Sequence, residues 1–194
     1  MNESELIINI QNGDSDSFRK LFDLYRDKAV RTAYHITGSQ AAAEDVAQEA
    51  FVKCYFEIGK LQNPECFKTW FYRLLVRTAW RYAAVEKKSV PVEEVFDQSK
   101  TSEEKSVEQQ YLETELTNTL YKQIQKLDKK RRTTVMLFYY SGLSTKEIAR
   151  VMGCMEGTVK SRLHSSRKIL KRNLENLTLK EGGYYGKAGY ESVL

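Results

Sequence analysis

The chain has 194 residues, 41% of them hydrophobic and 29% charged, and 31 Lys+Arg against 26 Asp+Glu give a net charge of +5. This length suits one or two domains of the usual ~100–150 residues, and no apolar run approaches the ~18–20 residues of a membrane span. The N-terminus is acidic rather than basic, which argues against a signal peptide. Three cysteines, odd in number and widely spaced, indicate a reduced cytoplasmic chain without a disulfide framework or a structural zinc site.

The charge is distributed unevenly along the chain. Residues 1–88 carry 13 Lys+Arg against 12 Asp+Glu (+1), residues 89–115 carry 2 against 8 (−6), and residues 116–194 carry 16 against 6 (+10). The middle stretch is also rich in Ser and Gln and poor in large apolar residues, which predicts a linker between two units. The basic final stretch favours a polyanionic partner.

The first half contains four or five helix patterns. Ser4 is a candidate N-cap for a short helix that ends near Gly13, and Asp16 is a candidate N-cap for the next helix. This second helix is expected to run to Ile36, and Gly38 stops it. Four apolar side chains follow the helical spacing i, i+3, i+4, i+7 and are expected to form one inward stripe, namely Phe18, Leu21, Phe22 and Tyr25.

A third helix opens at Ser39, and its inward face is expected to comprise Val46, Ala47, Ala50, Phe51, Cys54 and Ile58. Its other face carries a small acidic and amide strip at the spacing i, i+3, i+4, i+7, formed by Asp45, Gln48, Glu49 and Val52. Taken alone, simple solvation explains this strip as well as a binding surface does. A loop at residues 61–66 precedes a last helix. Every element has one apolar face and no segment alternates like a strand, so the sequence predicts an all-α bundle.

The last helix of the first half combines arginines with aromatic residues. Arg73, Arg77 and Arg81 fall at i, i+4, i+8 and therefore share one face. Aromatic rings are interleaved with them, and such rings can stack on unpaired bases while arginines hold the nucleic-acid backbone. Helical spacing favours a core position for Phe71, whereas Trp80 and Tyr82 fit the core and base stacking equally well.

The segment after the linker has the pattern of a helix-turn-helix. Asp128 can cap a helix that runs to Tyr140. Ser144 and Glu147 then form a capping box that opens a short helix, and Gly153 provides the turn that ends it. A longer helix begins near residue 156, and its inward face is expected to comprise Val159, Leu163, Ser166 and Leu170.

Another face of that longer helix is cationic. Lys160, His164, Lys168 and Lys171 follow one helical spacing, and residues 146–172 carry eight Lys or Arg against two Glu. Lys, Ser and His side chains can read base edges, and the flanking lysines and arginines can contact phosphates. A solvated helix face would explain the charge alone. The capping box, the glycine turn and the buried valine together favour DNA binding.

A helix-turn-helix leaves the role of the first half open. One candidate is a stand-alone repressor or activator with a helical effector domain, which binds paired half-sites as a dimer. The other is a subunit that gives a larger multisubunit complex its specificity. An enzyme ranks third, because the sequence holds no P-loop, no paired carboxylates in a pocket-like context and no Ser/His/Asp arrangement. A redox or metal switch through Cys66 or Cys154 is a minor alternative, and Cys54 fits the core.

Three segments together resemble a known family. DVAQEAF at 45–51, FKTWFYRLLVRTA at 67–79 and LSTKEIARVMGCMEGTVKSRLHSSRKILK at 143–171 look like the extracytoplasmic-function (ECF), or group 4, sigma factors of bacterial RNA polymerase, in the sigma-70 family. The likeness covers residues 5–175 in order and with similar spacing. It implies two helical domains joined by a flexible linker, with region 2 at 1–88, the acidic linker at 89–115, region 4 at 116–177 and a disordered tail at 178–194.

The resemblance also assigns surfaces to partners. The third helix would dock on a coiled coil of the largest catalytic subunit of the polymerase through Asp45, Gln48, Glu49 and Val52. The loop and helix that follow would melt and read the −10 promoter element through Gln62, Asn63, Phe67, Lys68, Trp70, Arg73, Arg77, Trp80 and Arg81. The longer helix of the helix-turn-helix would read the −35 element in the major groove through Thr158, Lys160, Ser161, His164, Ser165, Arg167 and Lys168.

The implied protein is a cytoplasmic initiation factor with no catalytic site, cofactor, metal or small-molecule substrate of its own. Its partners would be RNA polymerase core, promoter DNA and an anti-sigma factor, often membrane-anchored, which holds it inactive. The acidic linker would run through polymerase channels meant for nucleic acid. Arg77 stands where the family frequently has Asn, and Arg81 where an acidic or amide residue is frequent, which bears on the −10 sequence preference. Met155 stands where the family commonly has Ser or Pro, so the longer helix lacks its usual N-cap. The negative charge of Glu156 can instead stabilise the N-terminus of this helix through the helix dipole.

Overall fold

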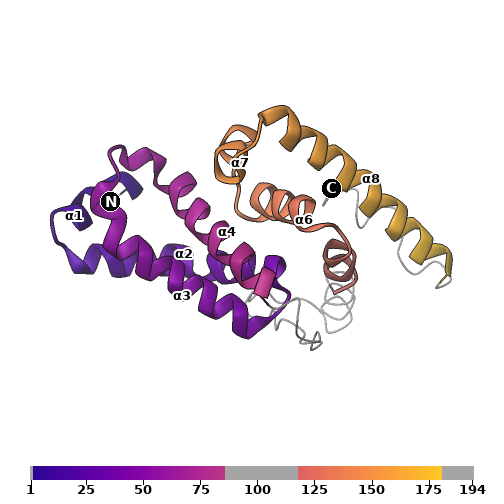
Figure 1. Cartoon of the computed structure of the whole chain (residues 1–194), viewed down its shortest axis with the longest axis horizontal. Coiled ribbons are helices and arrows are strands. Elements are labelled where there is room, and N and C mark those ends of the chain that lie inside the picture. The colour runs from indigo at the N-terminus through magenta and orange to yellow at the C-terminus, as the bar shows by residue number, and fades with distance from the viewer. Residues whose placement is uncertain (1, 86–117, 181–194) are drawn as a thin grey trace, which may run out of the picture.

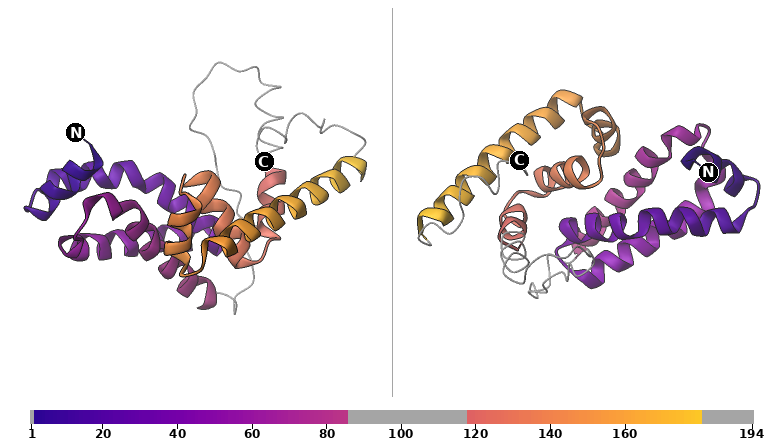
Figure 2. Two further views of the ribbon diagram at one scale, coloured as in Figure 1. Left: turned by 90° about the horizontal axis from the view of Figure 1, so that it is seen from above. Right: turned by 180° about the vertical axis from the view of Figure 1, so that it is seen from behind.

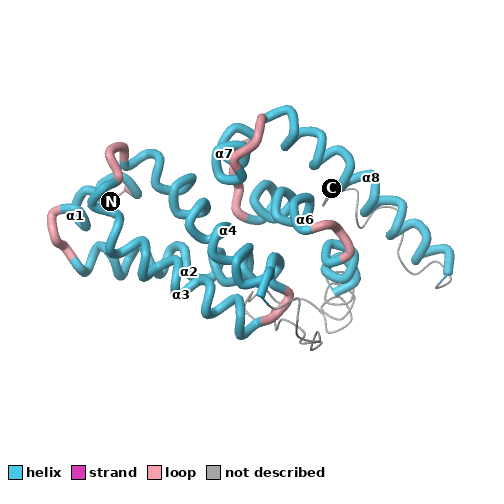
Figure 3. The backbone as a smooth tube through the Cα atoms, viewed as in Figure 1, coloured by secondary structure: helices cyan, strands magenta, loops and turns pink. Residues whose placement is uncertain are grey.

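The computed structural model describes residues 2–85 and 118–180, and these form two helical units (Figure 1). The regular elements in these two ranges are all helices, with short loops between them, which confirms the predicted all-α fold (Figure 3). The predicted linker at 89–115 lies outside the described residues, as do residues 181–194 of the predicted tail.

The first unit contains α1 (Glu3–Gln11), α2 (Ser15–Thr37), α3 (Gln40–Glu57) and α4 (Phe67–Val85). Two short 3₁₀ turns, η1 (Ile58–Lys60) and η2 (Pro64–Cys66), connect α3 to α4. Helices α2, α3 and α4 pack on one another, and α1 closes one end of the bundle (Figure 1).

Two helix starts differ from the prediction. The N-cap of α1 is Asn2 rather than Ser4, because the Asn2 side chain accepts from the Glu5 amide at 2.9 Å and the Glu5 carboxylate accepts from the Asn2 amide at 2.9 Å. The N-cap of α2 is Asp14 rather than Asp16. In both cases the cap is two residues earlier, where the backbone is still extended. The predicted stop at Gly38 is confirmed, with φ at +87° and its amide bonded to the Tyr34 carbonyl.

The inward face of α3 is confirmed, since its six predicted core side chains are all 5% exposed or less. Only half of the predicted apolar stripe on α2 is fully buried. Leu21 and Tyr25 are buried, whereas Phe18 and Phe22 are half-buried at the edge of the bundle. A helical stripe therefore predicts the apolar face of α2 correctly but not how much of it the neighbouring helices cover.

The second unit begins with a helical segment at 118–125 and continues with α6 (Lys129–Val135), α7 (Thr145–Met152) and α8 (Glu156–Lys180). Asp128 caps α6, as predicted, by accepting from two backbone amides. The helix then changes to a π-helix, η4 (Met136–Tyr140), in which the Ser141 amide reaches back five residues to the Met136 carbonyl. Helix α8 reaches Lys180, three residues past the predicted end of the second domain at 177.

The predicted helix-turn-helix is confirmed in its geometry. Ser144 and Glu147 form the capping box of α7, and Gly153 ends it in the left-handed region at φ +62°. The inward face of α8 is buried as expected, with exposed fractions of 3% or less at Val159, Leu163, Ser166 and Leu170.

Replacing Gly153 with alanine should lower the free energy of unfolding by about 1–2 kcal/mol, because a Cβ is unfavourable at this left-handed position. The control is Gly157→Ala, since Gly157 lies inside α8 without positive φ and has open space around it. Alanine there should be neutral or stabilise by up to about 1 kcal/mol. Urea unfolding measures both variants. Equal destabilisation by the two changes would contradict a specific requirement for glycine in the turn.

The two units pack against each other, with α4 beside α7 and α2 beside both α6 and η4 (Figure 2). One continuous apolar core runs through both, from Ile7 in α1 to Leu170 in α8. The described parts of the chain therefore form one packed body.

Candidate functional site

The predicted acidic strip lies on the outer side of α3. Asp45 and Gln48 are exposed, Val52 is 49% exposed and Glu49 is partly covered. The structure therefore places all four predicted residues on one accessible face, where a partner protein can reach them.

Glu49 is the centre of a small ion-pair cluster on this face. Its carboxylate accepts from Lys53 at 2.7 Å, one turn along α3, and also pairs with Arg81 of α4. The hydrogen bond from Lys53 and the pairing with Arg81 hold the pKa of Glu49 below its ordinary value, so this carboxylate is charged at neutral pH. A residue predicted to meet polymerase and one predicted to meet DNA are thus paired with each other.

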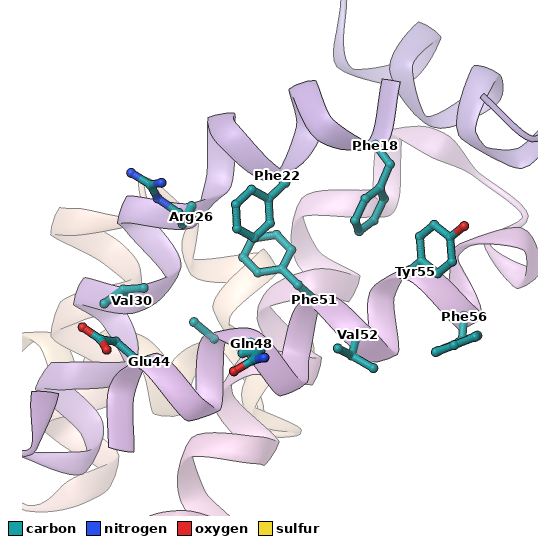
Figure 4. A pocket seen from close by; sticks show the side chains of 11 residues that line it. Phe18, Phe22, Arg26, Val30, Glu44, Gln48, Phe51, Val52, Tyr55 and Phe56 are labelled. Carbon is teal, nitrogen blue, oxygen red and sulfur yellow. The ribbon is translucent and has the colours of Figure 1, made fainter. Parts of the chain in front are cut away.

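An apolar groove of ≈ 580 Å³ runs between α2 and α3 beside the acidic strip (Figure 4). Phe18 and Phe22 point into it from α2, and Phe51, Val52 and Tyr55 line it from α3. Arg26 and Glu44 mark its polar edge. Gln48 and Val52 belong to both the groove and the strip, so one partner can contact both surfaces at once.

Large apolar side chains are unusually accessible at the end of this groove. Phe56 is 75% exposed and Tyr55 is 52% exposed, and their rings contact each other edge to face with centroids 5.6 Å apart. A contiguous apolar patch of this kind typically marks a protein-interaction site. The groove is absent from the sequence-based predictions, although Phe18 and Phe22, one turn apart on α2, are a signal for it.

The residues predicted to read the −10 element begin in the loop before α4. Gln62 and Asn63 are exposed, and the Asn63 side chain caps η2 by accepting from the Glu65 amide at 2.9 Å. Phe67 is fully buried and packs on Tyr25 with ring centroids 5.4 Å apart. Phe67 therefore anchors the loop from inside the core and does not present its ring to a base in this conformation.

Three further members of the −10 set are engaged by the second unit. The Lys68 ammonium donates to the Gly142 carbonyl at 2.9 Å, and the Arg73 guanidinium donates to the Arg150 carbonyl at 2.9 Å. The Trp80 indole N–H donates to the Thr133 hydroxyl at 3.1 Å. The remaining members are Trp70, which is half-buried against the core, and the exposed arginines Arg77 and Arg81.

The residues predicted to read the −35 element lie on α8. Lys160, Ser161, His164, Arg167 and Lys168 are all exposed. Thr158 and Ser165 are partly covered. The Ser165 hydroxyl donates to the Arg162 carbonyl at 3.1 Å and accepts from Arg131 at 3.0 Å, so it fastens α6 to α8.

The start of α8 is held in place by Glu156. Its carboxylate accepts from Thr145 of α7 at 2.8 Å and pairs with Lys160 at 2.9 Å. The hydrogen bond from Lys160 is the main reason why the pKa of Glu156 is lowered. Glu156 thus links the start of α8 to α7. The residue before it, Met155, is 78% exposed and has no side-chain oxygen with which to cap the helix.

The described residues hold no group of three or more His, Cys, Asp or Glu arranged for a metal ion. All three cysteines are free; Cys54 is buried, Cys66 exposed and Cys154 partly covered. In residues 2–85 and 118–180, every helix falls short of the length and apolar character that a membrane span requires.

Both helical units match models of known protein families. The model described as "Sigma-70 region 2" matches residues 21–88, and the model described as "Sigma-70, region 4" matches residues 117–170. The first match covers the acidic strip and the whole −10 set, and the second covers the helix-turn-helix.

Relatives match along nearly the whole chain. The ECF RNA polymerase sigma factor SigW of Bacillus subtilis is 33% identical over 178 residues, which is 87% of this chain and 94% of the relative. The RNA polymerase sigma-H factor of Pseudomonas aeruginosa is 31% identical over 183 residues, 90% of this chain and 95% of the relative.

Solved structures show the same fold at lower identity. CnrH, solved with the cytosolic domain of CnrY, matches 90% of this chain and 97% of its own, with a TM-score of 0.67 at 19% identity. The sigma factor RpoE of Bartonella quintana, solved with the anti-sigma factor NepR, matches 81% of this chain and 96% of its own, with a TM-score of 0.66 at 19% identity. With two matched domains in order and relatives similar over nearly their full length, the chain belongs to the ECF sigma factors of the sigma-70 family.

Proposed function

We propose that this chain is a group 4 sigma factor that binds RNA polymerase core and directs promoter-specific initiation by recognising −10 and −35 elements. The observation that carries the proposal is that one chain presents an exposed acidic strip beside an apolar groove and, separately, a helix-turn-helix with an exposed cationic face. The first surface suits a protein partner and the second suits DNA. The polymerase supplies the nucleotidyl transfer.

The docking surface is the strip of Asp45, Gln48, Glu49 and Val52 together with the groove between α2 and α3. A groove between two helices accepts the apolar side chains of a third helix, which fits a coiled coil of the largest polymerase subunit. The exposed Asp45 side chain beside it favours a basic partner surface, whereas Glu49 is already paired with Lys53 and Arg81.

The DNA-reading surfaces lie on α4 and α8. We assign −10 capture to residues of the loop at 61–66 and of α4. Arg77 is exposed, whereas Lys68 and Arg73 would have to leave their hydrogen bonds with the second unit. We assign −35 reading to the exposed face of α8, where Lys160, Ser161 and His164 can reach base edges and Lys168 a phosphate. We propose domain limits of 1–88 for region 2 and 116–177 for region 4, with α8 continuing past that limit to Lys180.

The proposed partners also include an anti-sigma factor that holds the chain inactive, at times at the membrane. RpoE of Bartonella quintana, whose fold is similar, was solved with such a protein. We place the factor in the cytoplasm, where polymerase and promoters are. The acidic linker at 89–115, with its net charge of −6, is proposed to occupy polymerase channels meant for nucleic acid.

The test is run-off transcription with sigma-free core polymerase and fragmented genomic DNA. The chain plus core should give transcripts with defined start sites, and core alone should not. Absence of transcripts together with absence of core binding would refute the proposal. A stand-alone regulator would instead bind duplex DNA as a dimer and need no polymerase, and the region 2 match at 21–88 leaves no support for an effector domain there.

A further inference from the structure

Helix α1 lies directly against the loop that carries the first residues assigned to the −10 element. This loop connects α3 to α4 through the two 3₁₀ turns η1 and η2, and α1 contacts both turns (Figure 3). Gln62 and Asn63 are exposed between the turns. Helix α1 contributes no residue to the −10 set, so it can influence this loop only through its contacts with it.

One side chain of α1 makes two hydrogen bonds to the backbone of the loop. The amide nitrogen of Gln11 donates to the Ile58 carbonyl at 3.0 Å and to the Leu61 carbonyl at 2.8 Å. Gln11 is the last residue of α1 and is partly covered. Carbonyl oxygens can only accept, so a side-chain nitrogen that carries at least two hydrogens fits between them, and a carboxylate of the same shape does not.

The two carbonyls held by Gln11 set the course of the loop. The Leu61 amide closes η1 by donating to the Ile58 carbonyl at 3.1 Å, and the backbone then becomes extended at Leu61. The Leu61 carbonyl belongs to the same rigid peptide plane as the Gln62 amide. Holding this carbonyl therefore fixes the direction in which the chain enters Gln62 and Asn63.

Helix α1 also supports the far end of the loop. The Tyr25 hydroxyl donates to the Glu3 carboxylate in the first turn of α1 at 2.6 Å. The ring of Tyr25 meets that of Phe67, the first residue of α4, edge to face with centroids 5.4 Å apart. Three buried apolar side chains fix α1 itself to the bundle, namely Leu6, Ile7 and Ile10. Helix α1 is thus an anchored support that holds the loop at both ends.

We propose that Gln11 is a positioning residue for −10 recognition, which orders the loop of Gln62 and Asn63 without touching DNA. This inference rests on the proposed function, which assigns these two residues to the −10 element. Side chains that recognise a base must be held close to their productive positions, and a loop that is ordered beforehand avoids the cost of ordering on binding. Loss of the two hydrogen bonds should therefore weaken discrimination between −10 bases while leaving −35 recognition intact.

Three variants separate this role from a general effect on the fold. Gln11→Glu keeps the shape of the side chain but places a carboxylate against two carbonyl oxygens. Asn12→Asp is the matched control, because it makes the same amide-to-carboxylate change one residue later, where the side chain is exposed at the C-cap of α1. Gln11→Lys restores hydrogen-bond donors, since an ammonium group has three, and should behave like the parent.

The first measurement is hydrogen–deuterium exchange of the backbone amides in the free chain, followed by mass spectrometry. Exchange in residues 58–66 should be at least about tenfold faster in Gln11→Glu than in the parent, because local opening of the loop becomes easier. Exchange in the buried parts of α2 and α3 should not change, and Asn12→Asp should match the parent. Unchanged exchange in the loop of Gln11→Glu would overturn the inference.

The second measurement is run-off transcription with core polymerase on pools of one promoter that the chain uses, randomised either at the −10 or at the −35 element. Gln11→Glu should reduce the preference among −10 bases by at least about threefold and change the −35 preference by less than about twofold. A chain that is merely less stable would give fewer transcripts with the same preferences. Asn12→Asp and Gln11→Lys should keep the preferences of the parent.

An unchanged −10 preference in Gln11→Glu, or an equal loss of preference at both elements, would overturn the inference. Absence of transcripts from the parent chain would instead refute the proposed function, and with it the −10 role of Gln11. The exchange measurement needs no polymerase, so it would still show whether Gln11 orders the loop. The two failures are therefore distinguishable.

Discussion

Replacing Phe56 with alanine should weaken binding of the chain to RNA polymerase core by about 30-fold, which corresponds to about 2 kcal/mol at a well-packed interface position. The ring is 75% exposed in the free chain, at the end of the groove between α2 and α3 (Figure 4). A partner helix seated in the groove would cover it. The free energy of unfolding should stay within about 0.5 kcal/mol of the parent, because little of the ring is buried before binding.

The matched control is Leu24→Ala. Leu24 is 58% exposed on α2 and is not part of the groove, so the change removes a comparable exposed apolar side chain elsewhere on the same unit. Core binding is measured by fluorescence titration with labelled protein, and stability by urea unfolding. A loss of core binding equal to that of Phe56→Ala would show that the groove has no special role in docking.

The second large effect is a loss of stability in mild acid that depends on His35. Burial, with the positive charges of Arg31 and Arg132 nearby, lowers the pKa of His35 to about 4. Its ring lies in the interface between the units, against the ring of Tyr121 with centroids 5.1 Å apart. The unfolded chain, with the ordinary pKa of about 6.5, therefore takes up a proton more readily than the folded chain between pH 6.5 and 4.

The free energy of unfolding should thus be highest above pH 6.5 and fall as the pH decreases, by about 2 kcal/mol at pH 5 relative to pH 7.5. The carboxyls with lowered pKa, such as Glu49 and Asp128, lose their contribution only at lower pH, near and below their ordinary values. The histidine therefore dominates the change in the free energy of unfolding between pH 6.5 and 5.

Urea unfolding at a series of pH values measures this slope. His35→Gln should remove most of it, since a neutral amide has no proton to gain. His164→Gln is the matched control, because it makes the same change at the other histidine of the chain, which is exposed on α8. A parent chain whose stability is flat from pH 7.5 to 5 would contradict a neutral, half-buried histidine at this interface.

Local sequence was sufficient for most helix ends and faces. The caps at Ser39, Asp128 and Ser144 and the stops at Gly38 and Gly153 are confirmed, because each depends on hydrogen bonds or backbone angles within a few residues. Two N-caps were misplaced by two residues, since Asn2 and Asp14 compete with nearby Ser4 and Asp16 and only the backbone conformation decides between them.

For the candidate surfaces, the sequence predicted which residues share a helix face but not how neighbouring helices cover that face. Helical spacing placed Asp45, Gln48, Glu49 and Val52 together on α3 and the cationic residues together on α8, and the structure leaves these faces accessible. The groove was not predicted, because periodicity identifies Phe18 and Phe22 as apolar but cannot say that α3 leaves them half covered.

By itself, therefore, the sequence determined the all-α fold, the family and the residues on each helix face. All of these follow from spacing within single helices or from contiguous motifs. Only the tertiary structure decided which of those residues are accessible together. The contacts of Lys68 with Gly142 and of Arg73 with Arg150 join residues more than 70 positions apart, and no local pattern encodes such pairs. The packing of α4 against α7 brings these residues together, whereas the cationic face of α8 lies outside that contact and stays exposed.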